Sequence, residues 1–275
     1  NGRVVLGGAT SFHTAMLRFK NLGSGSTGNA TVVEGRCGTL TRRLLIDCGF
    51  GIRQLQSRLA QAQLQPADLD GIFITHEHSD HIGCAQALAV RWRIPVWMSQ
   101  GTYSSLGAPH FAGPPRVARA MHARDMGAFS AMPFTVPHDA REPLHLRCSD
   151  GASHLAVLTD LGHASDHVLA ALQGCHALML EANHDPALLE ASAYPLFLKR
   201  RVSGPYGHLA NEATAGILQA VRHPRLQCVV AAHLSARNNT PALAQQAMGL
   251  ALGTNADEIT VASPTAGTPW LTVTG

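Results

Sequence analysis

A short segment of the sequence, HEHSDH at residues 76–81, concentrates potential metal ligands. It directly follows the apolar run GIFIT, which has the length and composition of a buried strand. In extended backbone, residues two apart project to the same side, so His76 and His78 can bind one metal ion. Asp80 and His81 fall where the chain turns into a helix and can bind a second ion. A solvated polar loop does not explain three His and one Asp in six residues, so the segment predicts a metal site.

Further polar side chains stand just beyond other strand-like segments. They are Asp47 after LLI, His138 after FTVP, Asp160 after LAVLT, Glu181 after ALML and His233 after CVVAA. Each alone has an ordinary structural interpretation, such as a cap or a turn residue. A hydrolase with two metal ions, however, needs N and O donors from distant strands, including a bridging carboxylate. Since sites in α/β proteins form where strands end, these residues predict one shared site.

The elements that position these residues alternate between strand-length apolar runs and helical stretches, which predicts a layered α/β fold. The predicted strands are Leu17–Leu22, Thr31–Val33, Leu44–Asp47, Gly71–Thr75, Pro95–Met98, Leu155–Thr159, Ala177–Glu181 and Gln227–Ala232. The predicted helices are Gly51–Gln63, Ile82–Arg91, Asp166–Leu172, Asn211–Val221 and Pro241–Leu252.

The composition fits an enzyme of this kind. Sixteen His exceed the 8 Phe, 3 Trp and 3 Tyr together, and imidazole is the commonest metal ligand and general acid or base. A formal net charge of +3 permits a polyanionic substrate without requiring one. The 6 Cys form no CxxC pair, so we expect reduced core thiols. No apolar run is long enough to span a membrane, and no membrane partner is expected.

No linker-like tract divides the 275 residues, so we expect residues 16–275 to form a single domain. Residues 1–15 precede the first strand-like segment and are interpreted as a cloning remnant or an upstream extension. They lack the long apolar stretch of a signal peptide, which favours a cytoplasmic location. The sequence leaves the oligomeric state open.

With these motifs in order, the chain resembles the metallo-β-lactamase-fold hydrolases. It is more narrowly similar to the YycJ/WalJ group, which is related to nucleases of the tRNase Z and RNase J types. The narrower resemblance rests on GSGSTGN at 23–29, LIDCG at 45–49, TDLG at 159–162, EANHD at 181–185, GHLAN at 207–211, and HLS at 233–235 followed by Asn238 and Asn239. It implies an αββα sandwich, in which two mixed sheets are flanked by helices and the site lies along one sheet edge.

The resemblance also implies the ligand set. One ion is held by His76, His78 and His138, the other by Asp80, His81 and His233, and Asp160 bridges them. Asp47 would support the ligand loop as an outer carboxylate. Five His and two Asp without Cys suit two divalent ions, with Zn²⁺ the first choice and Mn²⁺ the alternative.

The implied mechanism is attack on phosphorus by a metal-bridging hydroxide, with Asp80 among the catalytic residues. By resemblance to tRNase Z, Glu181 and His208 form a proton shuttle to the leaving group. Two departures from the family pattern are GHLAN where GHLSN is common, and Pro137 before His138 where Ser is usual. Neither removes a ligand.

Weaker candidates for substrate contacts lie elsewhere. Ser24, Ser26 and Asn29 of the Gly-rich loop can donate hydrogen bonds to phosphate, although such loops are also common turns. His184, with Asp185, lines the site or belongs to the cap of a helix starting at Pro186. The basic run containing Lys199 and Arg200 places positive charge near an incoming backbone, or is a solvated face.

The first functional hypothesis is therefore a phosphodiesterase acting on nucleic acid, specifically a 5′-to-3′ DNA exonuclease. The stretch from Asp160 to His208 is too short for the inserted domain by which β-CASP nucleases clamp RNA, which favours DNA over RNA. The alternative is a small-substrate metallo-hydrolase acting on a cyclic or small phosphodiester, a lactone or a thioester. A metal-binding regulator without catalysis is a third hypothesis, disfavoured because every expected ligand is present.

Overall fold

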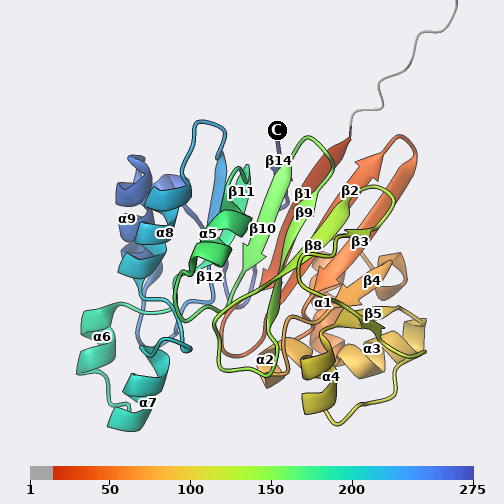
Figure 1. Cartoon of the computed structure of the whole chain (residues 1–275), viewed down its shortest axis with the longest axis horizontal. Helices are drawn as coiled ribbons and strands as arrows, with labels where there is room; N and C mark the ends of the chain where they lie inside the picture. The colour runs from red at the N-terminus through yellow and green to blue at the C-terminus, as the bar shows by residue number, and fades with distance from the viewer. Residues whose placement is uncertain (1–14) are drawn as a thin grey trace, which may run out of the picture.

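The computed structural model describes residues 15–275, and it contains two seven-stranded mixed sheets packed face to face (Figure 1). The expected αββα sandwich is confirmed. Residues 1–14, most of the predicted extension, lie outside the described part of the chain. The first sheet has the order β14 (Leu271–Val273), β1 (Met16–Gly23), β2 (Ala30–Cys37), β3 (Leu40–Ile46), β4 (Gly71–Phe73), β5 (Val96–Met98) and β6 (Arg116–Val117). The second has the order β13 (Thr260–Val261), β12 (Cys228–Ala232), β11 (Ala177–Glu181), β10 (His154–Leu158), β9 (Leu144–Ser149), β8 (Ser130–Thr135) and β7 (Arg124–Asp125).

Helices cover the outer faces of both sheets (Figure 1). Those before the second sheet are α1 (Ile52–Gln61), η1 (Pro66–Asp68), α2 (Ser79–Ile82), α3 (Ala85–Trp92) and α4 (Gln100–Ser105). Those between β10 and β13 in the chain are α5 (Asp166–Leu172), α6 (Pro186–Ala191), α7 (Leu196–Val202), α8 (Asn211–Val221), α9 (Pro241–Leu252) and η2 (Ala256–Glu258). Within residues 15–275, none of the helices combines the length and the apolar composition needed to span a bilayer.

Three apolar clusters hold these layers together. Phe19, Phe73 and Leu146 belong to the cluster between the two sheets. A second cluster lies between the second sheet and the helices α5, α8 and α9, and a third lies between the first sheet and α1 and α3. The central strands β10, β11 and β12 are parallel, and they are apolar except for His154 at the start of β10 and Glu181 at the end of β11, as expected for strands covered on both faces. Their carboxyl ends therefore meet at one edge of the sheet.

The helix predicted from Ile82 is interrupted and begins earlier. Helix α2 starts at Ser79, and Gly83 separates it from α3. The reason is a close approach between two backbones. A Cβ on Gly49 would lie 1.7 Å from the carbonyl oxygen of Asp80, and one on Gly83 would lie 2.3 Å from that of Cys48. This packing places Asp80 and His81 inside the first turn of a helix instead of before it.

Two other expectations need correction. The short strands β6, β7, β13 and β14 and the hairpin β8–β9 had no predicted counterpart; two- and three-residue strands carry no periodicity, and β8 contains Pro133. The expectation of reduced core thiols does not extend to Cys37, the last residue of β2, which is exposed. The other five are buried or half-buried, and all six are free.

Candidate dinuclear metal centre

The predicted ligands meet at the edge where strands from both sheets end. Asp47 follows β3 and His76 follows β4 in the first sheet; Asp160 follows β10 and His233 follows β12 in the second. His138 lies just beyond β8. These five side chains are buried although they are polar, which is costly unless the groups are paired or bind a ligand. The ends of two sheets therefore enclose one polar site.

Four groups of side chains place their donor atoms within 4.8 Å of one another, and two of them match the predicted ligand triads: His76, His78 and His138, and Asp80, His81 and His233. In the first triad, Nε2 of His76 and Nε2 of His138 lie 3.1 and 3.4 Å from Nδ1 of His78. In the second, Oδ2 of Asp80 lies 3.6 Å from Nε2 of His81 and 3.4 Å from Nε2 of His233.

These separations fit metal coordination. Ligands about 2.0–2.1 Å from a tetrahedral ion lie about 3.3 Å apart. Asp160 reaches both triads: Oδ2 is 3.0 Å from Nε2 of His81, and Oδ1 is 3.9 Å from Nε2 of His138. Asp160 Oδ2 and His233 Nε2 are buried and have no hydrogen-bond partner among the described residues. Buried polar atoms left without partners at the centre of a donor cluster are what a pair of divalent ions would satisfy.

Hydrogen bonds behind the ligands fix their orientation. Nδ1 of His81 donates to Oδ2 of Asp47 at 2.8 Å, and the backbone N–H of Thr75 donates to Oδ1 at the same distance. Nδ1 of His138 donates to the carbonyl of Gly207 at 3.1 Å. With Nδ1 engaged in this way, Nε2 of each ring is left to bind an ion, which is the usual arrangement around metal-bound His.

Two of the strand-end residues have strained backbone. Asp47 has φ 61° and His233 has φ 54°, in the left-handed region that non-glycine residues rarely adopt. Each is held by a hydrogen bond: the N–H of Asp47 donates to the carbonyl of Phe73 at 2.8 Å, and that of His233 donates to Oγ of Ser24 at 2.9 Å. Strain at both positions indicates that the fold maintains these side-chain directions.

Burial and neighbouring charges shift the pKa values of the clustered side chains. Burial lowers the pKa of His76 well below its usual value, and the neighbouring His81 lowers it further. Burial also disfavours the charged forms of His81 and Asp160. Even so, the Asp160 and Asp47 carboxylates raise the pKa of His81 well above its usual value, and His233 and His81 hold the pKa of Asp160 well below its own. The site is thus built to carry buried positive charge beside carboxylates.

The predicted pair Glu181 and His208 is also assembled. Nδ1 of His208 donates to Oε1 of Glu181 at 2.7 Å, while Oε2 accepts the N–H groups of Leu161 and Leu209 at 2.8 and 3.2 Å. Although burial lowers the pKa of His208, Glu181 raises it above its usual value. The His208 side chain is 24% exposed and lines the cleft, whereas Glu181 is buried behind it. This geometry leaves Nε2 of His208 as the group able to give a proton.

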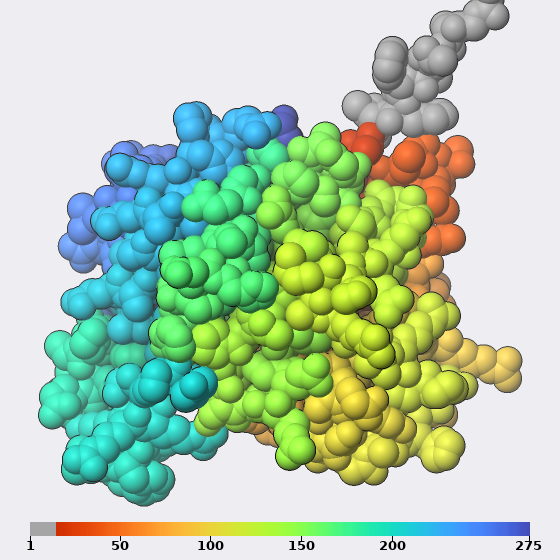
Figure 2. Space-filling view, viewed as in Figure 1, coloured from red at the N-terminus to blue at the C-terminus, as the bar shows by residue number. Residues whose placement is uncertain are grey.

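A cleft of about 360 Å³ opens above the ligands. Its walls include Arg201 of the basic run, Asn183 and Ser235 of the sequence motifs, and residues that the sequence did not single out, namely Asp139, Tyr194, Leu198 and Val202. Nε of Arg201 donates to Oδ2 of Asp139 at 2.8 Å, and Asp139 Oδ1 lies 3.4 Å from Nε2 of His138. Arg201 comes from α7, which projects with α6 at the lower left of the molecule (Figure 2). A cation from this projection therefore stands beside the ligands.

The candidate substrate contacts differ in whether their side chains reach the cleft. Ser24 and Asn29 are buried and bond to other protein groups. Oδ1 of Asn29 accepts from Oγ of Ser24 and from the N–H of Gly25, both at 3.0 Å, and Nδ2 of Asn29 donates to Oδ2 of Asp80 at 3.3 Å. Ser26 is exposed and lines the cleft.

The remaining candidates lie outside the cleft wall. His184 is buried, while Asp185 caps α6 by accepting the N–H of Leu188 at 2.9 Å. Lys199 and Arg200 lie on other faces of α7, and Arg201 is the member of the basic run that lines the cleft.

Comparison with known proteins identifies the family of this chain. Residues 42–234 match the family described as the Beta-lactamase superfamily domain. The chain belongs to this superfamily. Exodeoxyribonuclease YycJ of Bacillus anthracis is 33% identical over 241 residues, which cover 86% of this chain and 89% of that protein. Exodeoxyribonuclease WalJ of Streptococcus pneumoniae is 31% identical over 237 residues, covering 84% and 86%. The expected resemblance to the YycJ/WalJ group is confirmed.

Solved structures of the superfamily share the fold at lower sequence identity. The metallo-β-lactamase-fold protein YhfI of Bacillus subtilis superposes with a TM-score of 0.71 at 14% identity, covering 94% of this chain and all of that one. The short form of human tRNase Z has a TM-score of 0.62 at 18% identity, covering 92% and 98%. These likenesses show the arrangement of sheets and helices.

Proposed function

We propose that this protein is a phosphodiesterase that uses two divalent metal ions and acts on nucleic acid, specifically a 5′-to-3′ DNA exonuclease. The observation that carries the proposal is the joint presence of two ligand triads, a carboxylate between them, and a protonatable His208 in the same cleft. The two triads and the carboxylate suit activation of a nucleophile, and His208 suits protonation of an alkoxide leaving group. The similarity to the exodeoxyribonucleases YycJ and WalJ supports DNA as the substrate.

Seven residues would hold the ions: His76, His78, His138, Asp80, His81, His233 and Asp160. When bound, the two ions lower the pKa of water and offset the charge that develops on the phosphoryl oxygens. Nitrogen and carboxylate donors without Cys suit Zn²⁺ first and Mn²⁺ as the alternative. Asp47 is a positioning residue, because it holds the ring of His81 through Nδ1.

The other residues of the cleft act on the substrate itself. Arg201 can exchange its bond to Asp139 for one to a phosphate of the incoming strand, since its guanidinium lies at the edge of the cleft and is 62% exposed. Protonated His208 donates its Nε2 proton to the leaving 3′ oxygen. Glu181 holds the ring through Nδ1 and favours the charged form. The proton then returns to His208 from solvent at the open side of the cleft.

The proposal includes the domain organisation and the cellular compartment of the enzyme. Both sheets contribute ligands, which supports residues 16–275 acting as one catalytic domain. Six free thiols fit a reducing, cytoplasmic environment.

The test is hydrolysis of DNA by apo protein reloaded with Zn²⁺ or with Mn²⁺. Duplex and single strands labelled at either the 5′ or the 3′ end are compared with bis(p-nitrophenyl) phosphate and with RNA of the same sequence. We expect stepwise release of nucleotides from 5′ ends, abolished in Asp80→Ala, with the productive metal identified by the reloading. Cleavage of the small diester with DNA untouched would replace the nuclease by a small-substrate phosphodiesterase.

A further inference from the structure

A second cavity, of about 390 Å³, adjoins the metal cleft. We call it the neutral pocket; its walls include Gly25, Ser26, Leu234, Ser235, Ala236 and Pro264. Ser26 and Ser235 line both the cleft and this pocket, so the two spaces meet at these hydroxyl side chains. A group held in the neutral pocket would thus be next to whatever occupies the metal cleft.

The two spaces have opposite electrostatic character. The metal cleft contains Arg201, carboxylates and imidazoles of the predicted ligands, whereas none of the described residues that line the neutral pocket is charged. The neutral pocket instead combines apolar surfaces from Leu234, Pro264 and Val261 with a few hydroxyl groups at its rim. Such a mixture is typical of sites for small, flat, neutral groups that need a few hydrogen bonds. An anionic phosphate gains nothing there.

The walls of the neutral pocket are held in place. The N–H of Ser24 donates to the carbonyl of Ser263, and Nη2 of Arg58 donates to the carbonyl of Pro264 at 3.0 Å. Gly25 adopts φ 149°, a conformation that residues with a Cβ rarely adopt. The hydroxyls of Ser26 and Thr27, by contrast, are exposed and make no hydrogen bond within residues 15–275. They are available to a ligand.

A nucleotide combines an anionic phosphate, which matches the metal cleft, with a neutral, flat base, which matches the neutral pocket. We infer that the neutral pocket binds a nucleobase of the DNA strand next to the phosphate being cleaved, with Ser26 and Thr27 donating to its edge. The inference rests on the proposed function and adds a specificity site to it. The volume is in the range of pockets that bind small organic groups.

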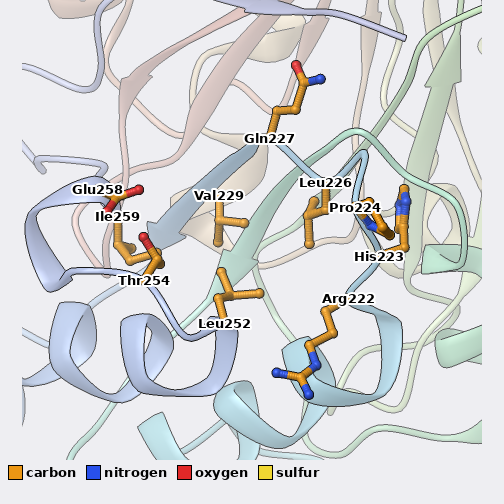
Figure 3. Close-up of a pocket in the computed structure, with 10 residues that line it drawn as sticks. All are labelled: Arg222, His223, Pro224, Leu226, Gln227, Val229, Leu252, Thr254, Glu258 and Ile259. Carbon is orange, nitrogen blue, oxygen red and sulfur yellow. The ribbon is translucent and has the colours of Figure 1, made fainter.

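A larger cavity elsewhere does not compete for this role. It has about 700 Å³ and is lined by Arg222, His223, Glu258 and mainly apolar neighbours (Figure 3). It lies beside the first residues of β12, whereas His233 follows the last, so the strand separates it from the metal centre. The neutral pocket is the cavity that opens beside the ligands.

The experiment combines removal of the base with filling of the pocket. The metal-loaded enzyme is given oligonucleotides that carry a single abasic unit at the first, second or third position from the 5′ end. In the wild type, one of these positions should lower kcat/KM about 5- to 150-fold, as expected for loss of one bound base. In Ala236→Trp and in Thr27→Phe, which fill the pocket from exposed positions, the same abasic unit should change kcat/KM less than about twofold. Val90→Trp adds the same indole to an exposed site on α3, and it should retain the full abasic effect.

The outcomes separate the two hypotheses. An abasic effect absent from the wild type, or equally large in both pocket-filling variants, would overturn the pocket while leaving DNA hydrolysis established. If bis(p-nitrophenyl) phosphate is cleaved and no oligonucleotide is, the proposed function fails and the inference fails with it. The site is supported if the abasic unit lowers kcat/KM in the wild type but has a much smaller effect in at least one folded pocket-filling variant.

Discussion

Removal of the His208 imidazole tests the proton-transfer step directly. His208→Ala should lower turnover of DNA by about 10²- to 10⁴-fold, the range typical of a general acid, which corresponds to about 3–5 kcal/mol of transition-state stabilisation. The structure indicates that little else would change. The side chain is 24% exposed, so no core cavity forms, and Glu181 keeps its hydrogen bonds from the N–H groups of Leu161 and Leu209. None of the seven predicted ligands is removed.

The assay compares two leaving groups. DNA releases an alkoxide, which needs a proton, whereas bis(p-nitrophenyl) phosphate releases a phenolate that leaves as the anion. The variant should therefore lose far more activity on DNA than on the small diester, with unchanged metal content. His163→Ala is the matched control. His163 is exposed and contacts the loop that precedes His208, donating from Nδ1 to the carbonyl of Pro205 at 2.7 Å, but it does not line the cleft. An equal loss on both substrates, or unchanged turnover of DNA, would refute the role of His208 as acid.

The companion substitution Glu181→Gln predicts a pH effect with a definite sign. Glu181 raises the pKa of His208, and the acid works only while protonated. Without the carboxylate this pKa falls, so the high-pH limb of the kcat profile should move to lower pH. Metal content must be checked in the same preparation, since Oε1 of Glu181 also lies 3.1 Å from Nδ1 of His233. A limb that stays in place in fully loaded protein would show that Glu181 does not tune His208.

Three further predictions follow from single contacts. Asp47→Ala removes the partner of His81 and should weaken metal binding about 10- to 100-fold in a chelator competition; unchanged affinity would contradict the positioning role. Arg201→Ala should raise KM for DNA and lower the slope of log KM against log salt concentration by about 1, the value expected for loss of one phosphate contact. A slope equal to that of the wild type would exclude this contact. Glu34, buried among three arginines, has a lowered pKa because Arg18 and other guanidinium groups outweigh its burial. Glu34→Gln should cost about 2 kcal/mol of unfolding free energy above about pH 4.3. Protonation of Glu34 removes its own contribution in acid, so this difference should disappear as the pH falls, and a constant difference down to pH 3 would refute the assignment.

The central strands, and the polar side chains that gather at their ends, could be predicted from the sequence because both depend on strong local patterns. Strands such as Ala177–Glu181 are continuously apolar, and their polar residue stands at the end, where the chain leaves the core. The seven predicted ligands come from four segments, and in each segment the polar residues follow a strand or an apolar run. Parallel pairing of β10, β11 and β12 then brings Asp160, Glu181 and His233 together without further information.

The rest of the site depends on packing that local patterns do not encode. The basic run of α7 gives no indication of which side chain faces the cleft, because helix rotation is set by contacts with the rest of the protein, and it is Arg201 that lines it. Asp139 follows a ligand and looks like an ordinary loop acid until its partner on α7 is known. Likewise, Ser24 and Ser26 are equivalent in the sequence, and only the folded loop turns one inward and the other toward the cleft.

The division of the ligands between two sheets links metal binding to the packing of the sandwich. His76, His78, Asp80 and His81 follow a strand of the first sheet, while His138, Asp160 and His233 follow strands of the second. Neither sheet alone provides both triads, since His138 completes one and His233 the other. The buried carboxylate of Asp160 faces His81 across this junction at 3.0 Å. Ions held by these residues would join the open edges of the two sheets, so the free energy of metal binding would add to the stability of the sandwich at the place where its core is most polar.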